Sequence, residues 1–140
     1  MKNVIVVFGG KSCEHDISVI TGVLTLNTIN STLFNAIPIY IATDGTWYTG
    51  KELSDISFYK TKKLKTLKRV SLLSGSNTIY IIRKGKLKPL VNVDCAINCT
   101  HGKNGEDGTL AGVFNSSNIA LVGSNNFSSS FSMDKEFTKT

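Results

Sequence analysis

The sequence lacks the composition of fibrous, disulfide-rich and membrane-spanning proteins: it has little proline, little cysteine and no long apolar run. Its 140 residues include only 2 Pro and 3 Cys, and charged residues make up 19%. This composition, with 41% apolar residues, excludes a disordered, collagen-like or coiled-coil chain. No run of 18 apolar residues is present, which excludes a membrane-spanning helix. We therefore expect one globular domain that buries a core.

The cysteines predict free thiols. Their number is odd, and no Cys-x-x-Cys pair is present. Cys95 and Cys99 are four residues apart on an expected strand, which separates them by roughly 13 Å. A disulfide needs Cα atoms within about 7 Å, so these two residues cannot form one while the strand persists. We expect a reduced, cytoplasmic protein.

Positive charge is concentrated in the middle of the chain. The net charge is +6, of which residues 51–70 carry +5 and residues 83–88 carry +4. Such a segment is typical of a nucleic-acid footprint or of a solvated surface insertion. Lys outnumbers Arg 14 to 2, although Arg is the residue that recognises phosphate with two parallel hydrogen bonds. We favour the surface insertion and expect no nucleic-acid partner.

Apolar runs and glycine positions predict an α/β fold. Strands are expected over residues 3–8, 36–42, 94–100 and 119–122. One helix is expected to begin near Ser12, a good capping residue, and another to cover residues 109–116. Helices between strands imply right-handed crossovers, and therefore a mainly parallel sheet flanked by helices.

Several local signals refine this prediction. Apolar residues recur at helical spacing after Ser12, at Ile17, Ile20, Val23 and Leu24. Pro38 predicts an edge position for its strand, or a place near the strand start.

The middle and the end of the chain give weaker signals. Residues 50–76 are expected to form short helical or irregular pieces. Residues 78–90 are expected to form an inserted β-hairpin that turns at Lys84-Gly85. A short helix is expected over residues 127–133.

Two glycine-rich loops carry the candidate chemistry. Residues 9–16 read Gly-Gly-Lys-Ser-Cys-Glu-His-Asp, and residues 101–108 read His-Gly-Lys-Asn-Gly-Glu-Asp-Gly. Each loop leaves the carboxyl end of an expected strand and enters a helix. Ligands of parallel sheets bind beyond the carboxyl ends of the strands, so we expect both loops to face one crevice.

Glu14 and His101 are the candidate site residues of these loops. Glu14 could bind a substrate ammonium, or it could only stabilise the first turn of its helix. His101 directly follows a strand end, which is a common place for active-site side chains. Alternatively, it could only form a hydrogen bond to the loop that it begins. For Glu106 and Asp107 we favour a capping role at the next helix.

A metal site is not predicted. Four Cys and His residues in or beside the two glycine loops could bind a metal, but they lack the ligand spacing of zinc sites. These candidates are Cys13, His15, Cys99 and His101.

Three segments resemble the signatures of D-alanine:D-alanine ligases. They are residues 9–18, residues 101–110 and residues 130–135, the last ending in Met-Asp-Lys. The resemblance extends over roughly residues 4–24 and 93–139, about half of the chain, and leaves the basic middle outside. The Glu-His-Asp variant and the long middle also resemble the vancomycin-resistance ligases that join D-alanine to D-serine.

The resemblance implies an ATP-grasp ligase of peptidoglycan precursor synthesis. In that family ATP, with Mg²⁺, phosphorylates the carboxylate of one D-alanine, and the amine of a second D-alanine attacks the acyl phosphate. The products are the dipeptide, ADP and phosphate. The full-length enzyme is then expected to be a cytoplasmic homodimer.

The resemblance also assigns roles to residues of this chain. Glu14 would hold the ammonium of the first D-alanine, and His101 with Gly102 would lie beside the substrate carboxylate and the acyl phosphate. Ile17 would line the pocket, and Lys135 would reach the ATP phosphates.

By the same resemblance, residues 1–140 are the N-terminal, Rossmann-like (pre-ATP-grasp) domain of a larger ligase. A variable basic insertion covers about residues 50–92, and the ATP-grasp domains with their magnesium carboxylates lie beyond Thr140. The fragment alone is expected to be inactive. The alternatives are a D-alanine:D-serine ligase and a stand-alone module that binds a small anion or a nucleotide.

Overall fold

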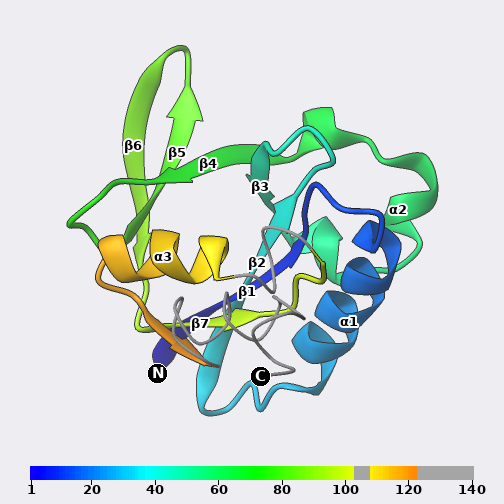
Figure 1. The fold of residues 1–140 in the computed structure, drawn as a ribbon, viewed down its shortest axis with the longest axis horizontal. Coiled ribbons are helices and arrows are strands. Elements are labelled where there is room, and N and C mark those ends of the chain that lie inside the picture. The colour runs from blue at the N-terminus through cyan, green and yellow to red at the C-terminus, as the bar shows by residue number, and fades with distance from the viewer. Residues whose placement is uncertain (103–107, 123–140) are drawn as a thin grey trace, which may run out of the picture.

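The computed structural model describes residues 1–102 and 108–122 and shows one mixed sheet with helices packed on it (Figure 1). The predicted helix over 127–133 lies outside the described residues. The elements are β1 Lys2–Gly9, α1 His15–Thr28, β2 Phe34–Ile41, β3 Trp47–Thr49, the 3₁₀ turn η1 Lys51–Ser54, α2 Phe58–Thr61, the 3₁₀ turn η2 Leu64–Thr66, β4 Lys68–Leu72, β5 Thr78–Arg83, β6 Lys86–Asn92, β7 Cys95–Asn98, α3 Thr109–Ser116 and β8 Ala120–Val122.

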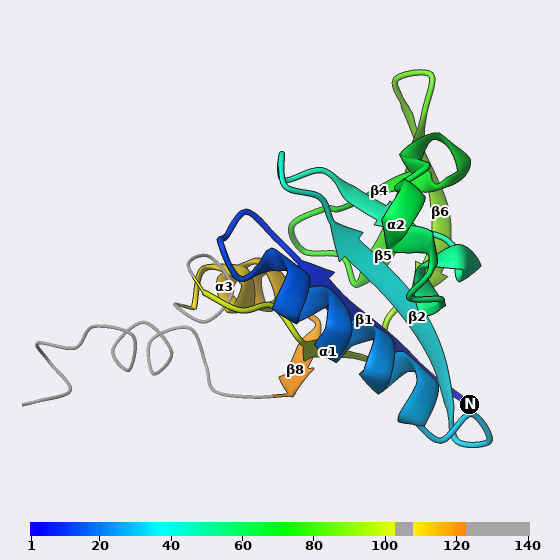
Figure 2. The same cartoon turned by 90° about the vertical axis from the view of Figure 1, so that its right-hand side faces the viewer.

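The eight described strands lie in the order β6-β5-β4-β3-β2-β1-β7-β8. The pairs β2-β1, β1-β7 and β7-β8 are parallel, whereas the pairs from β2-β3 to β5-β6 are antiparallel. The prediction of a mainly parallel sheet therefore holds for β2, β1, β7 and β8, and the two glycine loops follow β1 and β7. The remaining strands extend that sheet by an antiparallel meander, which continues away from α1 (Figure 2).

The predicted hairpin is confirmed at the end of this meander. Lys84 and Gly85 have φ angles of 51° and 72°, as a two-residue turn between twisted strands requires. Strand β4 was not predicted, because its sequence Lys-Arg-Val-Ser-Leu has little apolar alternation and buries only Val70. All the Lys and Arg side chains of residues 51–70 and 83–88 are exposed, as a solvated surface segment requires.

Strand β1 divides the core into two layers, because alternate side chains of a strand point to opposite faces. Ile5 and Val7 pack on one face together with Leu110 and Phe114 of α3. Val6 and Phe8 pack on the other face, in a cluster that includes Val19 and Val23 of α1. Helices α1 and α3 therefore cover opposite faces of the parallel strands.

Helix α1 begins at His15 and its N-cap is Glu14, two residues after Ser12, the predicted capping residue. The Ser12 hydroxyl accepts a hydrogen bond from the Glu14 N–H at 3.2 Å and donates to the His101 carbonyl at 2.9 Å. The side chain that was expected to cap the helix therefore also ties the first glycine loop to the second.

The apolar spacing predicted the helix correctly, but three of its six aliphatic residues are exposed. Ile17, Ile20 and Leu24 are 56%, 60% and 62% exposed. The buried face is formed by His15, Ser18, Val19, Gly22 and Val23, and the Phe8 ring packs directly against Gly22. A Cβ added at Gly22 would collide with that ring.

Pro38 does not lie on an edge strand, since β2 runs between β1 and β3. Strand β3, however, pairs only with Tyr40 and Ile41, the two positions at the end of β2. Pro38 therefore lies where the ladder to β3 has not begun, and its carbonyl accepts the Thr49 hydroxyl at 2.7 Å.

The three cysteines are free, as predicted. Cys99 is buried, and burial raises the pKa of its thiol. Among the described helices, none has both the length and the apolar character needed to cross a membrane.

The Ser18 hydroxyl joins the carboxyl ends of two parallel strands. It is fully buried, accepts the Gly9 N–H at 2.8 Å and donates to the Cys99 carbonyl at 2.8 Å. Gly9 ends β1, and Cys99 directly follows β7. One side chain of α1 thus holds both strand ends from which the glycine loops leave.

Replacing Ser18 by Ala should lower the free energy of unfolding by about 2 to 4 kcal/mol, because it leaves two buried backbone groups unpaired. Urea denaturation of the 140-residue chain measures this change. Ser116→Ala is the matched control, since that hydroxyl is exposed and its loss should cost less than about 0.5 kcal/mol. Equal costs at the two sites would contradict the bridging role.

Replacing Gly22 by Ala should cost about 1 to 3 kcal/mol, because the added methyl group overlaps the Phe8 ring. The same denaturation experiment in a Phe8→Leu background tests the cause. If the ring is responsible, Gly22→Ala costs clearly less there; an unchanged cost would point to another source of strain.

Candidate functional site

The two glycine loops meet beyond the ends of β1 and β7. The Ser12 hydroxyl donates to the His101 carbonyl at 2.9 Å. A Cβ added at Gly102 would lie 3.2 Å from Oγ of Ser12 and 3.9 Å from the carboxyl carbon of Glu14. The expectation of a shared crevice thus agrees with the described residues of both loops. Residues 103–107, with Glu106 and Asp107, lie outside the described residues.

The first loop has a backbone path that only glycine follows easily. Gly9 and Gly10 have φ angles of +93° and +101°, and a Cβ at Gly9 would collide with the Ile41 carbonyl. The Gly10 N–H donates to that carbonyl at 2.8 Å. The Gly10 carbonyl in turn accepts a hydrogen bond from Nδ1 of His15 at 2.7 Å. The loop is therefore fixed across the end of β2 and onto the first residue of α1.

Glu14 occupies the N-cap position of α1, yet its side chain makes no capping hydrogen bond to the helix. The residue is half-buried, and its carboxyl group lies against Gly102 of the second loop. Of the two interpretations left open by the sequence, this geometry favours a carboxylate presented to a ligand. Its negative charge still complements the helix dipole.

His101 is tied to α1 through its imidazole ring. Its Nε2 lies 3.2 Å from the Thr21 hydroxyl, which also lies 3.1 Å from the Ile17 carbonyl. The hydroxyl therefore links the His101 ring to the backbone of α1. Ile17 itself lies exposed one helical turn before Thr21. The start of α1 and the end of β7 thus bring Glu14, Ile17 and His101 into one region.

Lys135, the predicted phosphate-binding residue, lies outside the described residues. In the parts that the structure describes, no three His, Cys, Asp or Glu side chains come close enough to hold a metal ion. His15, one of the rejected zinc candidates, makes hydrogen bonds to the Gly10 carbonyl and the Tyr40 hydroxyl.

A cavity of about 200 Å³ adjoins this region on the α3 side of the sheet. Its lining combines the first loop and the end of β7 with apolar residues: Gly9, Gly10, Lys11, Ile41, Gly45, Trp47, Thr100, His101, Thr109, Leu110 and Val113. Glu14 and Ile17 do not line this cavity. His101 does line it, and the same residue also contacts α1 through Thr21. The sequence did not single out Lys11 as a candidate, although its place directly after two glycines was the available signal.

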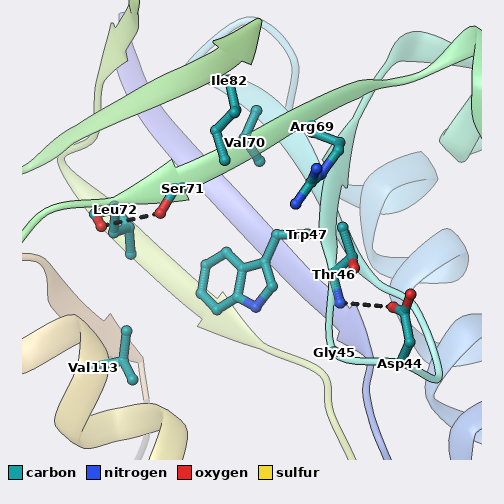
Figure 3. A pocket seen from close by; sticks show the side chains of 10 residues that line it. All are labelled: Asp44, Gly45, Thr46, Trp47, Arg69, Val70, Ser71, Leu72, Ile82 and Val113. Carbon is teal, nitrogen blue, oxygen red and sulfur yellow. Dashed lines mark hydrogen bonds between the residues drawn. The ribbon is translucent and has the colours of Figure 1, made fainter. Parts of the chain in front are cut away.

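A second hollow of about 420 Å³ continues from this cavity (Figure 3). The two share Gly45, Trp47 and Val113. The Trp47 indole lies in its middle, and the Arg69 side chain points toward it from β4. Asp44 accepts the Thr46 N–H at 2.9 Å, and the hydrogen bonds from Thr46 lower the pKa of its carboxyl group. No sequence signal predicted this hollow, because β4 was not predicted.

The family model described as the D-Ala–D-Ala ligase N-terminus matches residues 3–124. Among curated proteins, the D-alanine–D-alanine ligase of Thermosipho melanesiensis is 40% identical over an alignment of 141 positions, which covers 99% of this chain and 38% of that protein. The enzyme of Staphylococcus haemolyticus is 34% identical, over 96% of this chain and 36% of that protein. The chain thus spans less than two fifths of the curated relatives it matches.

Solved structures agree with the sequence comparison. The VanG D-Ala:D-Ser ligase of Enterococcus faecalis matches with a TM-score of 0.83 and 31% identity, over 97% of this chain and 39% of that one. The D-alanine–D-alanine ligase of Helicobacter pylori matches with a TM-score of 0.83 and 26% identity, over 99% of this chain and 43% of that one. The chain therefore belongs to the D-alanine–D-alanine ligase family and corresponds to the N-terminal domain of its members.

Proposed function

We propose that the full-length protein is an ATP-dependent D-alanine:D-alanine ligase, and that this domain forms the wall that holds the first D-alanine. The observation that carries the proposal is the meeting of the two glycine loops, which brings Glu14 beside Gly102 and His101. D-alanine offers an ammonium, a carboxylate and one methyl group. The described residues supply a group suited to each.

Glu14 would bind the ammonium, because a half-buried carboxylate forms a strong, charge-assisted hydrogen bond with a cation. Ile17 would pack against the methyl group. Gly102 leaves the space beside Glu14 open, which a side chain would narrow. His101 would lie beside the carboxylate and the acyl phosphate formed from it, where an imidazole stabilises developing negative charge. The Thr21 hydroxyl would fix the orientation of that ring.

The reaction would proceed by transfer of the γ-phosphoryl group of ATP to the carboxylate of the bound D-alanine. The amine of a second D-alanine would then attack the acyl carbon, and phosphate would leave. Mg²⁺ would neutralise the phosphate charges during transfer. We propose that ATP and Mg²⁺ bind mainly to the part of the ligase that relatives have beyond this domain, with Lys135 reaching the ATP phosphates.

The second substrate has two candidates. D-alanine is favoured because the curated relatives are D-alanine–D-alanine ligases. D-serine is the alternative, because the VanG D-Ala:D-Ser ligase is 31% identical to this chain. ADP release by the full-length enzyme with D-alanine alone, and with added D-serine, distinguishes the two.

In the full-length enzyme, Glu14→Gln should lower kcat/KM for D-alanine by about 10- to 100-fold, because it removes the charged partner of the ammonium. The measurement is ADP release coupled to dipeptide formation. Glu52→Gln is the control: this exposed residue of η1 is not part of the site, so its kcat/KM should stay within about twofold. Near-normal turnover by Glu14→Gln would refute the assigned role.

We also propose that the full-length enzyme is a cytoplasmic homodimer. The outward face of α1 supports this, because Ile20 and Leu24 are exposed there and no charged residue follows Asp16 in the helix.

Light scattering of the full-length enzyme should therefore give twice the monomer mass. The double substitution Ile20→Glu and Leu24→Glu should shift that mass toward the monomer, because it places charges in an apolar contact. A monomeric wild-type enzyme would contradict the proposal, as would a variant that remains fully dimeric.

A further inference from the structure

His15 lies buried beneath the first glycine loop, where the proposed chemistry gives it no role. The residue is 5% exposed, and both ring nitrogens are engaged. Nδ1 lies 2.7 Å from the Gly10 carbonyl, which can only accept, so Nδ1 carries a proton. In the neutral ring, Nε2 then accepts the hydroxyl proton of Tyr40 at 2.9 Å. The imidazole therefore connects the loop to strand β2.

Tyr40 is itself held in place by packing. It is 2% exposed, and its ring contacts His15 and Tyr59 edge-on at centroid distances of 5.5 and 5.6 Å. Its ring also lies against Gly9, since a Cβ there would be 3.1 Å from two of the ring carbons. Burial raises the pKa of the hydroxyl, which therefore keeps the proton that it donates. Tyr40 is thus a fixed donor at the end of β2.

Gly10 is held by hydrogen bonds through both its N–H and its carbonyl group. A Cβ added at Gly10 would meet nothing within 4 Å, so the space that a side chain would occupy is open. Its N–H donates to the Ile41 carbonyl at 2.8 Å, and its carbonyl accepts from His15. The first anchor is the last residue of β2, and the second is the first residue of α1, which is hydrogen-bonded to Tyr40 of β2. The loop they define leads directly to Glu14.

We propose that Tyr40 and His15 act as a pair of positioning residues that fix the loop over residues 9–14 and thereby set the place of the Glu14 carboxylate. The inference rests on the proposed function, because the position of Glu14 matters for activity only if it binds the substrate ammonium. His15 directly follows Glu14 and begins α1. A ring that turns away from Gly10 would therefore displace both the loop and the start of the helix.

The test compares Tyr40→Phe with Tyr59→Phe in the full-length enzyme. Both residues belong to one aromatic cluster, and the hydroxyl of the half-buried Tyr59 donates to the Leu53 carbonyl at 2.7 Å, away from the loop. Tyr40→Phe should raise the KM for D-alanine about tenfold and leave the KM for ATP within about twofold. Tyr59→Phe should leave both constants within about twofold. Equal effects of the two substitutions on the KM for D-alanine would overturn the proposal.

Substitution of His15 supplies a second comparison should Tyr40→Phe fail to fold. His15→Asn retains an N–H that can reach the Gly10 carbonyl, whereas His15→Leu retains none. The Asn variant should therefore have a lower KM for D-alanine than the Leu variant. The comparison is made between variants whose thermal stabilities are equal. The same KM in both would contradict the role of the Nδ1 hydrogen bond.

Amide hydrogen exchange separates this inference from the proposed function. Exchange over residues 9–14 should be faster in Tyr40→Phe than in the wild type, and unchanged in Tyr59→Phe. If the wild-type enzyme forms no dipeptide but this difference is present, the ligase assignment fails while the positioning of the loop stands. If exchange over 9–14 is the same in all three proteins, the positioning role itself is wrong.

Discussion

The hydrogen bonds of the Ser18 side chain are the constraint on which the candidate site depends. One hydroxyl on α1 holds the Gly9 N–H at the end of β1 and the Cys99 carbonyl after β7. Both glycine loops leave from these two points. The first helix is thereby fixed over the ends of two neighbouring parallel strands, and Glu14 and His101 come to lie in one region. The chemistry proposed for the site needs this shared origin, because the two residues are far apart in the sequence.

Elements with local signals could be predicted from the sequence. The helix over 109–116 and the turn at Lys84-Gly85 were found because the signals that indicate them act over a few neighbouring positions. The predicted cap of α1 was two residues too early, since Glu14 and not Ser12 is the N-cap, and the Ser12 side chain also makes a hydrogen bond to a carbonyl 89 residues away. The prediction of the antiparallel strands missed β4, because this strand has too few buried residues to show an apolar pattern. Tertiary contacts decide both cases, and no local signal reports them.

The same distinction applies to the site. The rule for parallel sheets placed both glycine loops at one edge, and the structure brings them together there. The sequence could not show what holds the first loop, because Tyr40 lies in another strand, 25 residues from His15. It also gave two equal interpretations of Glu14. The contact with Gly102 and the lack of a capping bond favour the binding role only once the fold is known.

The most direct measurement is a crystal structure of the full-length enzyme with D-alanine bound. The account predicts an ammonium nitrogen within about 3 Å of a Glu14 carboxylate oxygen, with the methyl group against Ile17 and the carboxylate beside His101. A D-alanine whose ammonium is bound by a different acidic residue, with Glu14 facing solvent, would contradict the central claim that the two glycine loops form the wall of the first substrate site.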